Sequence, residues 1–297
     1  MLSNIHDSFF KSLFSIKENL KDLLQGTLPQ EIFNRIIPDT LEYDPTEYVD
    51  PELAPYFRDI AFNMLYGDKK IKISLLYEHK SYPDKHIHLQ LLRYMLNVWE
   101  NQTDNKQDLT PVVCILFYHG KRRWTRQEIV KNIPEELKHF VPLFDYVLFD
   151  TKDMEDHAII SHFKRSNVKI GVWFLKHSDN LIGFIRDNPA LAREMFRELS
   201  NIEKTNIQRI AVYLYTVSGM APEKIDQIME TTSPEAIDAF DEFRIKLIEQ
   251  GREEGIEQSL KKIALNMILK GYADEQIAEI TNLSIRRIQV LRKECSV

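Results

Sequence analysis

The chain has 297 residues, of which 43% are hydrophobic, and a formal net charge of −6. This length allows one large core with a smaller appended unit, and the acidic balance excludes a surface that is basic throughout but not a local basic patch. No run approaches 18 consecutive apolar residues, the amphipathic first residues do not resemble a signal peptide, and the two cysteines lie far apart. We therefore expect a cytoplasmic protein without a transmembrane helix or a structural disulfide.

Helices are predicted at the start of the chain and a hairpin follows them. Apolar residues at helical spacing predict a first helix over 5–24, and Pro29 predicts the start of a short second helix through Ile37. Two runs rich in β-branched and aromatic residues, 59–66 and 71–77, flank the turn residues Gly67-Asp68 and predict two antiparallel strands.

The open end of this hairpin carries Asp59, Glu78 and Lys80. Glu78 and Lys80 are two apart on a strand, so they share one face and lie roughly 7 Å apart along it. A four-residue connection places Asp59 opposite Glu78, and a two-residue connection places it one diagonal away. A three-residue connection would turn Asp59 to the other face.

Two acids and an amine at the rim of a sheet suit metal-dependent phosphodiester hydrolysis. Facing carboxylates destabilise a sheet unless a cation compensates them, and Mg²⁺ prefers carboxylate oxygens. The ammonium of Lys80 could orient water or stabilise charge in the transition state. The alternative is a solvated strand end with an incidental Glu/Lys pair.

The middle of the chain predicts an α/β arrangement. A helix over about 85–100, a polar loop over 101–108, a strand over 112–118 and a short strand over 146–149 follow the hairpin. The strand at 112–118 could pair in parallel through the crossover helix. From about Met154 onward the pattern is mostly helical.

Two basic segments are candidate DNA contacts. Arg122 and Arg123 precede Trp124 in a loop that could clamp a DNA backbone, or that is simply exposed with the tryptophan packed on the core. Arg286 and Arg287 lie in the last of three helices expected over 263–270, 274–281 and 284–293, with Asp274 and Ser284 as N-caps and Gly271 as a C′ residue. These helices resemble a helix-turn-helix or form a packing appendage with a solvated basic face.

Several short motifs occur in a fixed order along the chain. They are His6-Asp7-Ser8-Phe9-Phe10-Lys11, Glu78-His79-Lys80-Ser81-Tyr82-Pro83-Asp84, Leu91-Leu92-Arg93-Tyr94-Met95, Leu116-Phe117-Tyr118-His119-Gly120 and Gly251-Arg252-Glu253-Glu254-Gly255. This set resembles the recombination-promoting nuclease and putative transposase family, a branch of the PD-(D/E)xK nuclease superfamily, over most of residues 5–150. The resemblance implies a mixed sheet flanked by helices and a metal-dependent DNA endonuclease activity.

The resemblance also assigns residues. Asp59 matches the first motif acid, although Arg-Asp stands here for Pro-Asp; Glu78 matches the second acid and Lys80 the terminal lysine, where many relatives have Gln. Gln90 matches a helix position that reaches the active site, or is a polar residue on a half-buried helix. Asp7 is a further carboxylate of the site, or an acid favoured at a helix start.

Together these patterns predict a PD-(D/E)xK nuclease-like domain with a helical extension over residues 1–240 and a small helical domain over 241–297. The predicted function is DNA cleavage dependent on Mg²⁺ or Mn²⁺ and linked to recombination or mobile elements. The alternative is a DNA-binding or regulatory interaction protein that acts through its C-terminal helices. We expect DNA as a partner, no membrane, and assembly into a homo-oligomer as an open alternative.

Overall fold

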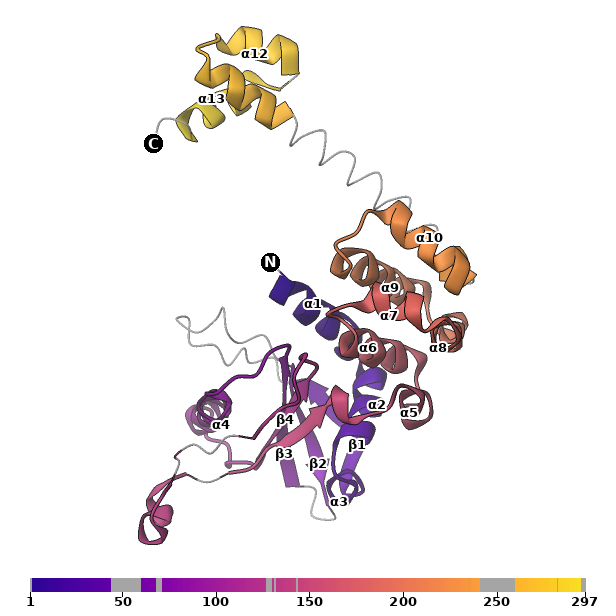
Figure 1. Ribbon diagram of the computed structural model, residues 1–297. Coiled ribbons are helices and arrows are strands. Elements are labelled where there is room, and N and C mark those ends of the chain that lie inside the picture. Colours follow the sequence, from indigo (N-terminus) through magenta and orange to yellow (C-terminus); the bar gives the residue numbers. More distant parts are fainter. Residues whose placement is uncertain are drawn as a thin grey trace. The chain divides into compact units, whose positions relative to one another are not determined.

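The computed structural model describes residues 2–43, 60–67, 71–126, 130, 132–142, 144–234, 236–240, 260–281 and 283–294 (Figure 1). The chain divides into two compact units, Met1–Phe240 and Asp241–Val297. The first unit is a mixed α/β structure that combines one sheet with many helices. In this unit the helices and strands are α1 (Leu2–Phe14), α2 (Lys17–Thr27), α3 (Gln30–Phe33), β1 (Ile36–Tyr43), β2 (Ile60–Tyr66), β3 (Ile71–Lys80), α4 (Ile87–Asp104), β4 (Val112–Tyr118), η1 (Glu135–Phe140), β5 (Val147–Asp150), η2 (Thr151–Asp153), α5 (Asp156–His162), α6 (Ser166–Lys176), α7 (Leu181–Asp187), α8 (Pro189–Phe196), η3 (Arg197–Asn201), α9 (Lys204–Val217) and α10 (Pro222–Thr232).

The sheet has five strands in the order β1-β2-β3-β4-β5. The first three strands pair antiparallel, and β3, β4 and β5 pair in parallel. Because a parallel connection needs a crossover, α4 carries the chain from the end of β3 to the start of β4. The predicted parallel pairing of the strand at 112–118 is therefore confirmed.

The register of the hairpin is the one expected for a four-residue connection. Tyr66 pairs with Ile71, and Ile60 at the start of β2 pairs with Tyr77. This is one of the two registers for which the sequence predicts Asp59, Glu78 and Lys80 on one face, and Asp59 itself lies outside the described residues.

The N-terminal prediction was wrong in two places. The single helix expected over 5–24 is broken into α1 and α2 at Ser15 and Ile16. The helix expected from Pro29 through Ile37 ends at Phe33, and β1 begins at Ile36 as the edge strand of the sheet. β1 includes Pro38, and its register with β2 shifts between Ile37 and Glu42. A proline is tolerated there because an edge strand or a bulge does not need its missing N–H.

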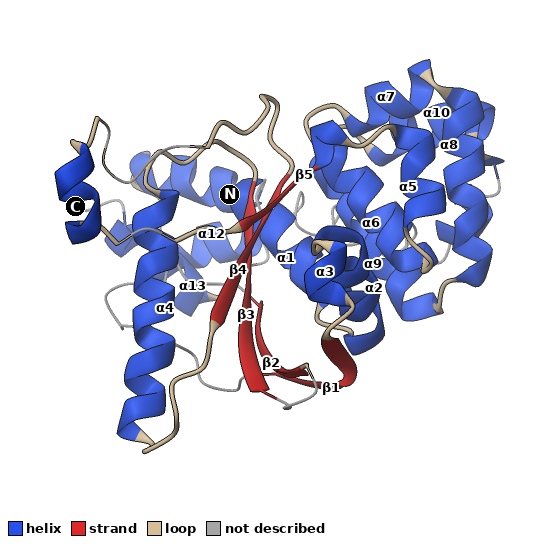
Figure 2. Ribbon diagram, turned by 90° about the horizontal axis from the view of Figure 1, so that it is seen from below, coloured by secondary structure: helices blue, strands red, loops and turns tan. Residues whose placement is uncertain are grey.

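Alternate residues of β4 pack against different helices. Cys114, Leu116 and Tyr118 join Ile87 and Leu91 of α4 in one buried cluster. On the other face Phe117 lies against Phe10 and Phe14 of α1, with ring centroids 5.1 and 6.4 Å apart. Figure 2 shows α4 on one side of the sheet and α1 on the other. The sheet is thus covered on both faces, as parallel strands require.

The helices α2, α5, α8 and α9 pack against α6, whereas α7 and α10 pack against α8 and each other. The buried side chains of α6 include Trp173 and Phe174, whose rings contact Phe196 of α8. α1 packs against both α6 and α9, so it links the helical part to the sheet. Among the described residues, no helix combines the length and the apolar character needed to cross a bilayer.

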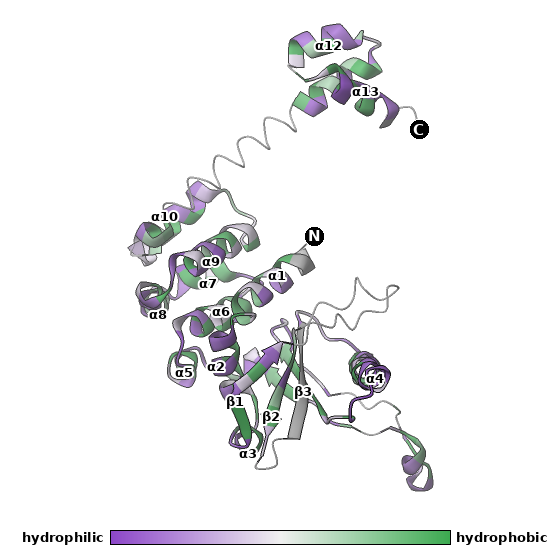
Figure 3. Ribbon diagram, turned by 180° about the vertical axis from the view of Figure 1, so that it is seen from behind, coloured by the Kyte–Doolittle hydropathy of each residue, from purple (hydrophilic) through white to green (hydrophobic). Residues whose placement is uncertain are grey.

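The second unit is helical where it is described. Residues 260–269 are helical, and α12 (Asp274–Thr281) and α13 (Ile285–Glu294) follow. Its core consists of Ala264, Ile268, Ile277, Ile288 and Leu291. Gly271 has φ +84°, which favours glycine at the turn between the helices. Hydrophobic and hydrophilic residues are interspersed along α12 and α13 (Figure 3), as expected for helices with one buried face.

Candidate active site

Lys80 and Gln90 meet at the carboxyl end of β3. Lys80 is the last residue of that strand, and Gln90 lies in the first turn of α4. The Lys80 Nζ donates a hydrogen bond of 2.8 Å to the Gln90 Oε1. Ile87 and Leu91 bury the apolar face of α4 on the sheet, so Gln90, one residue before Leu91, lies beside that face and reaches the strand end. Two of the predicted site residues are therefore in contact.

The loop between β3 and α4 also contributes to the surroundings of Lys80. The Asp84 Oδ2 lies 3.5 Å from the Lys80 Nζ, and the ring centroid of Tyr82 lies 5.7 Å from the same atom. The other carboxylate oxygen of Asp84 accepts a hydrogen bond of 2.8 Å from the backbone N–H of His86. The side chain of Lys80 is 11% exposed and that of Asp84 is 23% exposed. The Lys80 side chain is therefore largely shielded from solvent.

The structure describes only part of the two predicted metal-binding residues, Asp59 and Glu78. Glu78 is a residue of β3 that pairs with Leu116 of β4, but its side chain lies outside the described structure. Asp59 lies outside the described residues. No three His, Cys, Asp or Glu side chains gather into a metal-binding group among the described residues. The donor chemistry of the predicted pair fits a hard divalent cation, because both residues would offer carboxylate oxygens.

Asp7, the further candidate, lies on α1. Its carboxylate is 3.5 Å from the Lys11 Nζ, one helical turn along. This contact is of the kind that stabilises a helix surface between positions i and i+4.

A histidine pair that the sequence reasoning did not combine lies next to Lys80. The backbone N–H of His119, directly after β4, donates to the backbone oxygen of Lys80 at 3.0 Å. The rings of His119 and His6 of α1 are 5.2 Å apart, and the His6 Nδ1 lies 2.8 Å from the hydroxyl of Tyr213 on α9. Both histidines lie in the short motifs that occur in order along the sequence. This was the only sign in the sequence analysis from which the pair could have been proposed.

Burial controls the protonation of this cluster. Desolvation lowers the pKa of His119 to about 3, helped by the nearby His6, while the hydrogen bond to the Leu175 backbone opposes the shift. Burial also lowers the pKa of His6 and raises the pKa of Tyr213. At neutral pH all three side chains are therefore uncharged. They act as a polar link between α1, α9 and the strand ends.

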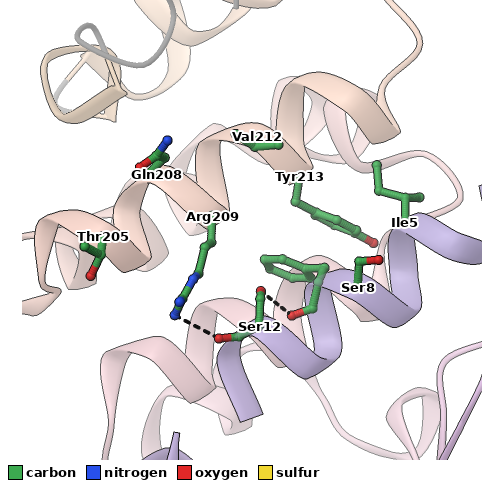
Figure 4. A pocket seen from close by; sticks show the side chains of 9 residues that line it. Ile5, Ser8, Ser12, Thr205, Gln208, Arg209, Val212 and Tyr213 are labelled. Carbon is green, nitrogen blue, oxygen red and sulfur yellow. Dashed lines mark hydrogen bonds between the residues drawn. The ribbon is translucent and has the colours of Figure 1, made fainter. Parts of the chain in front are cut away.

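An open groove of about 450 Å³ lies between α1 and α9 (Figure 4). Its lining combines apolar side chains with hydroxyl, amide and guanidinium groups: Ile5, Ser8, Phe9, Ser12, Thr205, Gln208, Arg209, Val212 and Tyr213. Arg209 reaches across it and donates to the Ser12 backbone oxygen at 2.9 Å. Neither Lys80 nor Gln90 is among the described residues that line this groove, so it is separate from their contact.

The basic loop after β4 is partly folded onto the core. Trp124 is 8% exposed, its ring lies 4.9 Å from that of Tyr118, and its indole N–H donates to the Tyr146 hydroxyl at 3.0 Å. Of the two alternatives predicted for this loop, the structure has the tryptophan packed on the core. Gly120 is needed beside it, because a Cβ there would lie 2.2 Å from the Tyr118 hydroxyl oxygen.

The two arginines of this loop remain at the surface. Arg122 and Arg123 are both exposed, and the Arg123 Nη1 lies 3.3 Å from the Asp153 Oδ1. An exposed ion pair of this kind contributes little and is easily exchanged for another anion. Both guanidinium groups thus stay accessible to a phosphate.

In the second unit, Arg286 and Arg287 are exposed in the first turn of α13. The Ser284 Oγ caps this helix by accepting from the backbone N–H of Arg287 at 3.3 Å. Asp274 is not an N-cap but the first residue of α12, and its carboxylate binds the guanidinium of Arg292 at 2.7 Å. Arg292 is therefore paired within the unit and contributes less to the basic face expected for this helix.

Comparison with known proteins finds one family and several relatives. Residues 4–209 match the family described as "Putative transposase, YhgA-like". The inactive recombination-promoting nuclease-like protein RpnE of Escherichia coli (strain K12) is 22% identical over 294 residues, which cover 95% of each chain. The recombination-promoting nuclease RpnD of Escherichia coli O157:H7 is 29% identical over 122 residues, 40% of this chain and 47% of RpnD. The recombination-promoting nuclease RpnA of Escherichia coli (strain K12) is 29% identical over 119 residues, 40% of this chain and 41% of RpnA. No solved structure gives a significant match.

Proposed function

Because the chain belongs to the YhgA-like putative transposase family, we propose that it is a divalent-metal-dependent DNA endonuclease whose cleavage is linked to DNA recombination. We further propose that residues 1–240 have the PD-(D/E)xK nuclease fold. Relatives named recombination-promoting nucleases support the activity. The relative named as inactive makes the identity of the active-site residues the decisive question.

The contact between Lys80 and Gln90 is the observation that carries the proposal. The carboxyl ends of parallel strands are where α/β proteins bind their ligands, and this contact lies at the end of β3 beside β4. The Lys80 amine, bound there by the Gln90 amide, is a compact group of N–H donors whose place at the strand end suits contact with a phosphate oxygen or a water.

Each proposed residue has a distinct role. Asp59 and Glu78 would hold Mg²⁺ or Mn²⁺, which when bound supplies Lewis-acid stabilisation of charge on the scissile phosphate. The Lys80 ammonium would donate to the attacking water or to a phosphate oxygen in the transition state, and Gln90 would keep the ammonium in place. The exposed Arg122 and Arg123 would contact the DNA backbone.

The test is incubation of supercoiled plasmid with the full chain in Mg²⁺, Mn²⁺ or EDTA. We expect nicking that requires a divalent cation and that Glu78→Gln abolishes, since the amide keeps the size of the side chain but removes its charge. Glu223→Gln, at an exposed glutamate of α10, is the matched control and should cleave like the wild type. A wild-type protein that leaves plasmid intact with both cations would refute the proposal.

A second candidate function is DNA binding through the C-terminal helices without cleavage. The exposed pair Arg286 and Arg287 favours it. In a mobility-shift assay, the double variant Arg286→Ala/Arg287→Ala should lower the affinity for duplex DNA and flatten its dependence on salt concentration, because each lost phosphate contact releases one counterion fewer. Unchanged binding would exclude this surface as a DNA contact.

A further inference from the structure

We propose that Asp84 is a positioning residue that acts through Lys80. Asp84, the Tyr82 ring and Gln90 together hold the Lys80 ammonium in place, and we call this set of groups the clamp. The effect on cleavage rests on the proposed function, but the clamp itself does not. Among the described residues, the groups around the Lys80 Nζ include the Gln90 Oε1 at 2.8 Å, the Asp84 Oδ2 at 3.5 Å and the Tyr82 ring centroid at 5.7 Å.

The clamp restricts the flexibility of the lysine side chain. Its ammonium sits on a flexible four-carbon stem with many rotamers, so it must be fixed before it can serve as a donor at a set position. Gln90 fixes it from α4 with a neutral oxygen. Asp84 adds a negative charge from the loop, and the face of the Tyr82 ring attracts a cation at this distance.

Asp84 is itself fixed by the backbone. Its Oδ1 accepts from the His86 N–H at 2.8 Å, directly before α4 begins at Ile87. This local bond is the Asx type of turn that sets the direction of a carboxylate. The other oxygen then points to Lys80, so the conformation of one short loop determines where the ammonium lies.

Partial burial strengthens the attraction between Lys80 and Asp84 relative to that of a fully exposed ion pair. The side chains of Lys80 and Asp84 are 11% and 23% exposed, and attraction is screened less as water is excluded. Asp84 could alternatively serve only to cap the loop. Asp84→Asn separates the two roles, because asparagine keeps an Oδ1 that accepts from His86 but removes the charge that faces Lys80.

The first measurement does not depend on cleavage. The folded protein is treated briefly with an amine-acylating ester, and acylation of Lys80 is compared with that of Lys176 by peptide mass spectrometry. Lys176 is the internal reference because it has a similar pairing, with its Nζ 3.3 Å from the Asp156 Oδ1. We expect Asp84→Asn to raise Lys80 acylation roughly 5-fold, as for loss of an ion pair of modest strength. Asp156→Asn should raise the acylation of Lys176 and leave that of Lys80 unchanged.

The second measurement is a double-mutant cycle on plasmid cleavage. Asp84→Asn should lower kcat roughly 5-fold with little change in KM, and it should have no further effect in the Lys80→Gln background. Asp84→Glu should recover part of kcat, because it returns the charge. An equal loss in both backgrounds would show that Asp84 only supports the loop.

A third variant guards against misfolding. Tyr82 is 57% exposed, so Tyr82→Leu should fold normally and raise Lys80 acylation by less than Asp84→Asn does. Unchanged Lys80 acylation in both Asp84→Asn and Tyr82→Leu would overturn the clamp. A wild-type protein that does not cleave DNA would instead refute the proposed function, and the acylation result would still decide whether the clamp exists.

Discussion

Acidification from pH 7 to pH 5 should destabilise the first unit through His119. This side chain is buried, and its pKa falls from the usual 6.5 to about 3, chiefly because burial removes the imidazole from water. Between these two pKa values the unfolded chain binds a proton at His119 that the folded protein does not. The contribution of His119 to the free energy of unfolding is therefore fully present above about pH 7, is lost as the pH falls through 6.5, and levels off near pH 3.

The magnitude follows from the gap between the two pKa values. At pH 5 the unfolded histidine is 1.5 pH units below its pKa of 6.5, and each unit corresponds to about 1.36 kcal/mol. The free energy of unfolding should therefore be lower by about 2 kcal/mol at pH 5 than at pH 7. Burial lowers the pKa of His6 as well, so its contribution has the same sign.

The assay is urea unfolding at a series of pH values, compared with the variant His119→Gln. Glutamine does not titrate, and its amide can still donate toward the Leu175 backbone oxygen that His119 contacts. The variant should lose about 2 kcal/mol less between pH 7 and pH 5 than the wild type. The imidazole resonances of His119, followed by NMR, should also stay unchanged down to pH 5. Equal pH dependence in both proteins, or a His119 resonance that titrates near pH 6.5, would refute the reasoning.

Other predictions concern the site and the two units. Asp59→Ala should reduce plasmid nicking by about two orders of magnitude or more while the fold is retained, and a wild-type rate would remove this residue from the site. Lys80→Gln should reduce the rate roughly 10²–10³-fold if the ammonium stabilises the transition state, and a rate close to wild type would show that the charge is dispensable. Trp124→Ala should cost about 3–5 kcal/mol in urea unfolding, because it empties a core position, and the folded fraction should bind DNA with unchanged affinity. A chain ending at Gln250 should stay folded by circular dichroism and bind DNA more weakly in a mobility-shift assay; loss of the fold would show that the first unit depends on the second.

Local patterns in the sequence were enough to predict the central part of the sheet. The two runs rich in β-branched and aromatic residues predicted the hairpin strands, the possible lengths of the connection limited the registers, and the observed pairing of Tyr66 with Ile71 is one of those predicted. The helix after the hairpin is long enough for a crossover, so the parallel pairing of β4 could also be anticipated. Its end was misplaced, because α4 continues to Asp104 through residues expected to form a loop.

The edge strand could not be recognised in this way. β1 has no regular alternation of buried and exposed residues; only Ile36 and Leu41 are buried in it. Its proline also argues against a strand when the sequence is read alone. The strand forms because the edge of β2 offers it backbone hydrogen bonds, which depend on residues distant in the sequence.

The same distinction applies to the candidate site. The types and spacing of Glu78 and Lys80 suggested metal-dependent chemistry from the sequence, and Gln90 was proposed from a family resemblance. Which groups surround the Lys80 ammonium depended on the loop that returns Asp84 toward the strand end and on the packing of α4. Likewise, His6 and His119 meet only because α1 packs on the sheet and on α9. Sequence periodicity reports neighbours along one element, whereas contacts between elements depend on side-chain packing that no single segment specifies.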